Sequence, residues 1–318
     1  MRPFERLVVP CIALLAMSCA SHAHVSRDAS APRLFAIQSN MWVNLHHFLR
    51  VVARGEPAPA TLDAGEQEIW DAAVATYKAK DMNRDLLRDD GMLAIKNTLR
   101  TVAGDASLPD IPGEPELRDL LERVAPVYRR HWWPAHDTIN RAWIATAQPL
   151  VARYGEQLSR ELAASYGESW PAEPIPVDVS VSAGPVGAYT SWPPHTTIAS
   201  TDASYYGLAS LEMLFHESSH QWGKRLDTAI RNAAEIHKKQ VPPQLWHAVL
   251  FYNSGELTRR ALVADGVGWY RDYASAHDLY PSLCGAGCRE RVVKHWKPHL
   301  DGQLSIEAAL DNLVAEWP

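Results

Sequence analysis

A short stretch of alternating residues interrupts a sequence that is otherwise patterned for helices. The segment "PIPVDVSVSA" (174–183) is rich in valine and repeats apolar residues at every second position, which is typical of a strand. "VGAYTSW" (186–192) and "HTTIAST" (195–201) follow as two more short strands, joined by Gly-Pro and Pro-Pro turns. We therefore expect a mostly helical protein built around one small sheet.

On both sides of this sheet, apolar residues recur at the three- and four-residue spacing of helices. Upstream, the pattern predicts helices over 34–53, 62–80, 85–104, 112–133 and 134–167. Downstream, it predicts helices over 205–227, 242–253, 254–274, 288–299 and 305–317. The expected fold class is α+β, with a helical N-terminal region at 33–168 and a second region at 169–318 that holds the sheet.

The helix after the sheet carries the motif H-E-x-x-H. In "LEMLFHESSHQW" (211–222), His216 and His220 are four residues apart and share one face of a helix. Imidazole nitrogens are preferred zinc ligands, and catalytic zinc sites keep one position open to water. Glu217 follows the first histidine, so its carboxylate can take a proton from that water as a general base. The residues beside the motif are uncharged, which favours a buried site over a solvated helix face.

A third protein ligand is expected on a later helix. Glu256 follows the apolar segment "LWHAVLFYNSG" (245–255), and a carboxylate buried there needs a partner such as a metal ion. Glu235, in "RNAAEIHKK", is the alternative ligand. The competing interpretation of Glu256 is an ordinary ion pair with Arg259 or Arg260 on the same helix.

These segments resemble zinc metallopeptidases of the gluzincin type. A narrower resemblance, to a group of secreted bacterial zincin-like proteins, is carried by "FHESSHQW" and "LWHAVLFYNSGELTRRAL" and covers about residues 175 to 275. The resemblance implies a zincin-like core in which His216, His220 and Glu256 hold Zn²⁺. It implies Glu217 as the base. It also implies a cleft lined by an edge strand, "GAYTSW" or "HTTIAST", that pairs with an extended peptide.

A donor that stabilises the oxyanion is also expected, of the Tyr, His or Arg type. We favour Tyr270, in "GVGWYRDYA", as this second catalytic residue. The other candidates on nearby helices are Tyr252, Tyr273, His247 and His277. Asp265 is a candidate for orienting a ligand histidine through its second ring nitrogen. His46 and His47 are expected to be structural or surface residues.

The sequence therefore predicts a zinc-dependent hydrolase that cleaves peptide bonds in a peptide or protein substrate. One alternative is a zincin-fold module of the cell envelope that binds zinc without catalysis. Another is a helical protein in which the motif is a coincidence and binds no metal. Hydrolysis of an amide that is not a peptide bond would use the same residues, so this reaction is a further alternative. The formal net charge is −6, and the sequence has no basic stripe of Lys and Arg, so nucleic acid is not an expected partner.

Residues 1–23 have the pattern of an export signal. A basic start precedes the apolar run "LVVPCIALLAM" (7–17), which is too short to span a membrane, and "SHA" fits cleavage after Ala23. Lipidation at Cys19 is the alternative. The remainder contains no run long enough to cross a membrane. We expect a periplasmic or secreted protein without a transmembrane segment in the mature chain.

Two cysteines remain if this signal is removed. Cys284 and Cys288 lie in "CGAGC". In an oxidising compartment a disulfide between them is the expected pairing, because no second Cys or His pair stands nearby at metal-ligand spacing.

Overall fold

The computed structural model describes residues 33–80, 84–86, 89–184 and 187–318. These residues belong to one compact unit. The predicted export signal and Cys19 lie outside the described residues. None of the described helices combines the length and the apolar character needed to cross a membrane.

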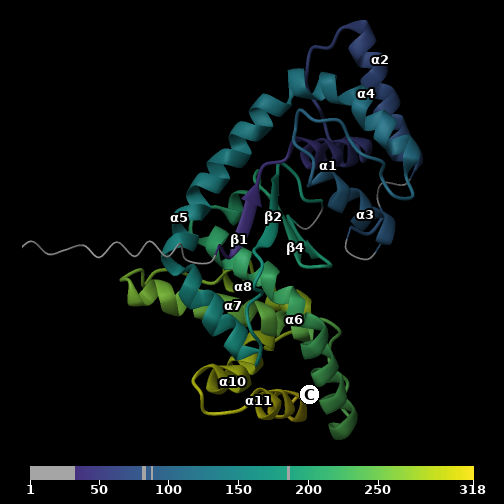
Figure 1. The fold of residues 1–318 in the computed structure, drawn as a ribbon. Helices are drawn as coiled ribbons and strands as arrows, with labels where there is room; N and C mark the ends of the chain where they lie inside the picture. The colour runs from purple at the N-terminus through teal and green to yellow at the C-terminus, as the bar shows by residue number, and fades with distance from the viewer. Residues whose placement is uncertain (1–32, 81–83, 87–88, 185–186) are drawn as a thin grey trace, which may run out of the picture. The chain divides into compact units, whose positions relative to one another are not determined.

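The fold is α+β and mostly helical, as predicted (Figure 1). The first half contains β1 (Phe35–Gln38), α1 (Met41–Ala53), α2 (Ala64–Ala79), α3 (Asp90–Leu99), α4 (Pro115–His131) and α5 (Trp133–Ser165). The sheet continues with β2 (Ile175–Ser180), β3 (Ala188–Ser191) and β4 (His195–Ala199). A short 3-10 turn, η1 (Ala203–Tyr205), then leads to α6 (Leu208–His237), α7 (Leu245–Ala264), α8 (Tyr273–Ala276), α9 (Tyr280–Cys284), α10 (Cys288–Leu300) and α11 (Ile306–Ala315).

The strands form one sheet in the order β1-β2-β4-β3. β1, β2 and β4 run parallel, and β3 pairs antiparallel with β4. The three strands predicted from the alternating segments are confirmed. β3 is consequently an edge strand of the described sheet, and it is the strand next to the H-E-x-x-H helix.

β1 lies in a segment for which the sequence pattern predicts a helix. The expected helix over 34–53 is wrong over residues 34–40, because the chain forms a strand there and the helix begins at Met41. Asn40 caps that helix by accepting a hydrogen bond from the backbone N–H of Val43. Pairing with β2, far along the chain, decides the conformation of β1, and local periodicity could not show this.

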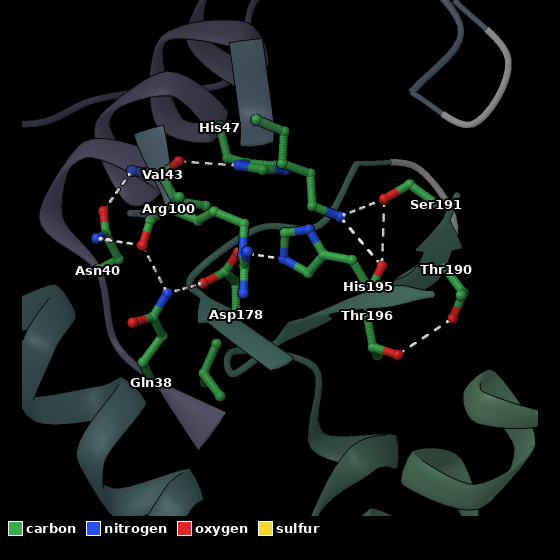
Figure 2. A network of polar contacts seen from close by, with 12 residues as sticks. Gln38, Asn40, Val43, His47, Arg100, Asp178, Thr190, Ser191, His195 and Thr196 are labelled. Atoms are coloured by element: carbon green, nitrogen blue, oxygen red, sulfur yellow. Dashed lines mark hydrogen bonds and ion pairs between the residues drawn. The ribbon is translucent and has the colours of Figure 1, made fainter. Parts of the chain in front are cut away.

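The two faces of the sheet differ in chemistry, because successive side chains of a strand point to opposite sides. One face buries apolar side chains such as Val177 and Ile198 in the main core. The opposite face is polar and buried (Figure 2). There, His195 Nε2 lies 2.5 Å from Asp178 Oδ2, and Lys96 of α3 contacts the β3–β4 hairpin. The sheet therefore carries a layer of buried polar side chains on the side of α1 and α3 and an apolar core on the side of α6.

The apolar core has two large parts. The main part lies between the apolar face of the sheet and α5, α6, α7, α10 and α11. The second is formed by α1 to α4 and contains the tryptophans Trp42, Trp70 and Trp132. The H-E-x-x-H helix belongs to the main part, so its position is fixed by packing along most of its length.

The predicted disulfide is confirmed. Cys284 at the end of α9 is joined to Cys288 at the start of α10. Gly285 and Gly287 between them have φ values of 84° and 70°, which L side chains rarely adopt. Glycine at these two positions allows the chain to turn within a loop of this size.

Candidate metal centre

α6 positions the first two histidines of the site. Leu211 and Leu214 bury one side of this helix in the main core. His216 and His220 follow one turn apart, with ring centroids 5.1 Å from each other. His216 is 1% exposed, whereas the side chain of His220 is 24% exposed. The pair therefore leads from the interior of the protein toward its surface.

α7 contributes a third histidine, His247. Its Nε2 lies 3.2 Å from Nε2 of His216, and its ring centroid lies 5.0 Å from that of His220. Among the described residues, these three histidines form a group whose ligand nitrogens all lie within 4.8 Å of one another. Two nitrogens bound to one tetrahedral zinc at about 2.0–2.1 Å would be roughly 3.3–3.4 Å apart. The observed spacing of His216 and His247 thus fits a shared metal ion.

The environment keeps these imidazoles neutral, the form that binds metals. Burial lowers the pKa of His220 to about 4. Burial, with a smaller contribution from His220, lowers the pKa of His247 to about 3. Burial also holds the pKa of His216 well below its usual value, and the other two histidines add to this effect. Each ring therefore has an unprotonated nitrogen available at neutral pH.

Aromatic packing holds the rings in place. Phe251 stacks on His216 with a centroid distance of 3.8 Å, and Trp246 stacks on His247 at 5.0 Å. Ser254 Oγ lies 3.5 Å from the second ring nitrogen, Nδ1, of His216. These contacts come from α7, so the packing of α7 against α6 also orients the candidate ligands.

Glu217 lies beside the histidines and is 4% exposed. Its Oε2 lies 3.9 Å from Nε2 of His220. Thr190 of β3 approaches the same oxygen at 2.8 Å. Burial raises the pKa of Glu217 to about 7, against the opposing effects of Thr190 and Lys96. The structure therefore places a carboxylate with an altered proton affinity next to the predicted ligands.

The structure does not place Glu256 with the histidines. Its two carboxylate oxygens accept hydrogen bonds from Arg259 at 2.8 and 2.9 Å and from Arg260 at 2.8 Å. Glu256 is nine positions after His247 on α7, and at 3.6 residues per turn this puts the two side chains about 180° apart. Glu256 therefore forms the ion pairs of the competing interpretation, and His247 lies where a third ligand is expected.

Glu235, the alternative third ligand, is also remote. It lies on the same continuous helix as His220, and its side chain is exposed near the end of α6. Fifteen residues of helix correspond to about 22 Å. Glu235 therefore cannot reach a metal held by His216 and His220.

Tyr270, the favoured oxyanion donor, has its hydroxyl engaged elsewhere. Tyr270 donates a hydrogen bond of 2.6 Å to Oε2 of Glu212, which lies one turn before His216 on α6. Glu212 also accepts the backbone N–H of Tyr273 at 3.0 Å. The catalytic role of Tyr270 stays a prediction without support from this geometry.

The remaining candidates fall into distinct settings. Tyr273 stacks over Phe251, the residue that stacks on His216, with a centroid distance of 6.3 Å. Asp265 pairs with Arg153 at 2.7 Å, away from the ligand histidines at the end of α7. His46 and His47 are buried on α1. His46 forms a hydrogen bond with Tyr77, and His47 forms hydrogen bonds with the backbone of Val43 and with Tyr189. Tyr273 is therefore connected to the histidine cluster through Phe251, and His46 and His47 have structural contacts on α1.

The sequence pattern does not single out His247 as a candidate ligand. It is half-buried and stands in the first turn of an apolar helix, between the buried residues Leu245 and Ala248. A histidine in such surroundings requires a polar partner. Together with two histidines on the preceding helix, this was the available signal for a third ligand.

No protein-family model, curated protein or solved structure matches this chain.

Proposed function

We propose that this protein is a zinc-dependent hydrolase of the metallopeptidase type. The observation that carries the proposal is the convergence of three neutral histidines, His216, His220 and His247, beside the buried carboxylate of Glu217. These three imidazoles would hold the ion. A tetrahedral zinc with three protein ligands keeps one position open to water, which is the arrangement of a catalytic site.

The chain supplies a proton carrier next to this centre. Zinc, when bound, would supply a water with a pKa near neutrality and would polarise a substrate carbonyl. The carboxylate of Glu217 accepts a proton from the attacking water and later donates it to the leaving amine nitrogen. Because Glu217 is 4% exposed, this transfer is sheltered from bulk water.

The position of β3 favours an extended peptide as substrate. β3 is an edge strand of the described sheet, and its Thr190 contacts Glu217. An edge strand offers unpaired backbone groups to which a peptide can add as a further strand. A peptide bound in this way would run past Glu217 and the histidines.

We also propose that the protein is exported. Support comes from the N-terminal sequence pattern and from the disulfide between Cys284 and Cys288, a pairing typical of oxidising compartments. The periplasm and the extracellular medium both fit this chemistry.

Replacement of Glu217 by Gln tests the proposed reaction. The wild-type protein, loaded with zinc, is incubated with a mixture of unstructured peptides, and the fragments are identified by mass spectrometry. We expect fragments from the wild type and a loss of turnover of about 10²- to 10⁴-fold in Glu217→Gln at the same zinc content. Equal hydrolysis by both proteins would contradict the role of Glu217. Zinc binding without cleavage by the wild type would favour the non-catalytic zinc-binding module.

A further inference from the structure

The edge strand β3 contacts the proposed base directly. Thr190 Oγ1 lies 2.8 Å from Oε2 of Glu217 and 2.9 Å from the backbone oxygen of the same residue. It also lies 3.2 Å from Oγ1 of Thr196, its cross-strand partner on β4. The two threonines therefore share one face of the hairpin, but the contact with Glu217 belongs to Thr190.

The opposite face of the same hairpin is fixed by Lys96. Its Nζ atom lies 3.0 Å from Ser191 Oγ on β3 and 3.3 Å from the backbone oxygen of His195 on β4. These two residues form the strand pair next to Thr190 and Thr196 (Figure 2). Lys96 is 2% exposed, so bulk water does not compete for its hydrogen bonds. A single buried lysine side chain, whose pKa burial lowers to about 7, thus ties both strands of the hairpin to α3.

The pairing of His195 with Asp178 extends this layer to the centre of the sheet. His195 Nε2 lies 2.5 Å from one carboxylate oxygen of Asp178, and the side-chain amide of Gln38 donates to the other at 2.8 Å. β1, β2 and β4 are therefore connected on the polar face by side chains as well as by backbone pairing (Figure 2). A hairpin held in this way offers Thr190 at a fixed place.

We propose that Thr190 is a positioning residue for Glu217 and that Lys96 fixes the strand that carries it. The inference rests on the proposed function, because it assigns the two residues a role in that reaction. A glutamate has several rotatable bonds, and a proton carrier must hold its carboxylate toward the reacting atoms. The β-branched side chain of Thr190 has a restricted χ1, so its hydroxyl oxygen is held in one place. Its hydrogen bond holds Oε2 on the side of His220.

Three substitutions separate positioning from simple packing. Thr190→Val keeps the branched shape and removes the hydroxyl. Thr190→Ser keeps the hydroxyl and removes the methyl group. Thr196→Val removes the neighbouring hydroxyl, which has no contact with Glu217 among the described interactions. Metal content and thermal stability are measured for each protein, so that a variant that fails to fold is recognised.

The probe is acetohydroxamate, titrated into cobalt-substituted protein and followed by the visible spectrum of the metal. A hydroxamate binds a metal as its anion and gives its proton to a neighbouring carboxylate, so its affinity reports the placement of Glu217. We expect unchanged metal content in all variants. We expect about tenfold weaker probe binding in Thr190→Val, recovery in Thr190→Ser and no change in Thr196→Val. Lys96→Met should also lower the affinity for acetohydroxamate, as Thr190→Val does.

Turnover gives a second measurement once a peptide substrate is identified. Thr190→Val should lower kcat by about 10- to 100-fold with little change in KM, because Glu217 acts in the transition state. Equal probe affinity in Thr190→Val and wild type would overturn the proposal, and so would equal losses in Thr190→Val and Thr196→Val. A wild type that binds metal and probe but cleaves no peptide would contradict the proposed function, while the order of probe affinities would still decide the role of Thr190.

Discussion

At the residue scale, the candidate metal centre depends on which face of α7 each side chain occupies. His247 and Glu256 belong to one apolar helix but lie on opposite sides of it, with His247 toward α6 and Glu256 toward two arginines. α7 is buried on most of its surface and has no polar stripe to mark its inner face. Burial of the Glu256 carboxylate therefore does not indicate a metal ligand. The arginines three and four residues later indicate an ion pair instead.

Glu212 is a buried carboxylate that should make stability depend on pH. It is fully buried, and its pKa is raised to about 8, mainly by burial and to a smaller degree by Asp272. From its ordinary pKa of 4.5 up to about 8, the unfolded chain has released a proton that the native protein retains. The free energy of unfolding should consequently fall as the pH rises through this range.

The substitution Glu212→Gln tests this dependence. Chemical denaturation of metal-free protein at a series of pH values should show wild type losing stability relative to Glu212→Gln between pH 5 and 8. The difference for one proton approaches about 1.4 kcal/mol per pH unit. Glu235→Gln, on the exposed end of the same helix, is the control and should follow the wild-type profile. Parallel profiles for Glu212→Gln and wild type would show that Glu212 ionises normally.

At the scale of elements, the site depends on the close contact between α6 and α7. Gly223 of α6 faces the ring of Trp246, and a Cβ at this glycine would lie 2.9 Å from the nearest ring carbon. Trp246 in turn stacks on His247 with an interplanar angle of 19°. The absence of a side chain at Gly223 therefore sets the distance between the helix with two histidines and the helix with the third.

Gly223→Ala should disturb the metal centre without touching a ligand. The added methyl group has to displace Trp246, which should destabilise the protein by about 1–3 kcal/mol. Because His247 moves with Trp246, we expect zinc affinity to fall about tenfold by competition with a chelator. Gly65→Ala on α2 is the control, since its nearest atom would be at an ordinary 3.5 Å. That control should be neutral or stabilising by up to about 1 kcal/mol, with unchanged zinc affinity. Unchanged affinity in Gly223→Ala would contradict the coupling.

Most elements of this fold could be predicted from periodicity. The strands β2, β3 and β4 and the helix of the H-E-x-x-H motif follow directly from alternating and helical patterns. β1 could not be found in this way, because its conformation is set by pairing with β2 across a long stretch of chain. Thr190 was also missed as a contact of Glu217, since strand register and the distance to α6 are tertiary properties.

At the scale of the whole molecule, the disulfide between Cys284 and Cys288 is the structural feature that tests the proposed export. Mature protein made in an oxidising compartment should show no free thiol at Cys284 and Cys288. For a sequence separation of 4, reduction or the change Cys284→Ser should lower the free energy of unfolding by about 2 kcal/mol. Thiol titration of native and denatured protein, followed by denaturation with and without reductant, measures both quantities. Two reactive thiols in the native protein would contradict the pairing.

The sequence was sufficient for the general form of the site and insufficient for its completion. His216, Glu217 and His220 share a short motif, so their proximity follows from one helix. His247 and Thr190 come from different elements, and each reaches the motif through packing. Residues within one element are predictable from spacing, whereas residues contributed by other elements require the arrangement of those elements in space.

The identity of the third ligand is the central claim, and zinc content tests it most directly. Zinc per chain is measured by mass spectrometry in wild-type protein and in His247→Ala and Glu256→Gln, after equal incubation with zinc and removal of the excess. We expect about one zinc in the wild type, a near-complete loss in His247→Ala and full retention in Glu256→Gln, because the wild-type Glu256 carboxylate binds arginines. Retention of zinc in His247→Ala together with its loss in Glu256→Gln would contradict the three-histidine centre.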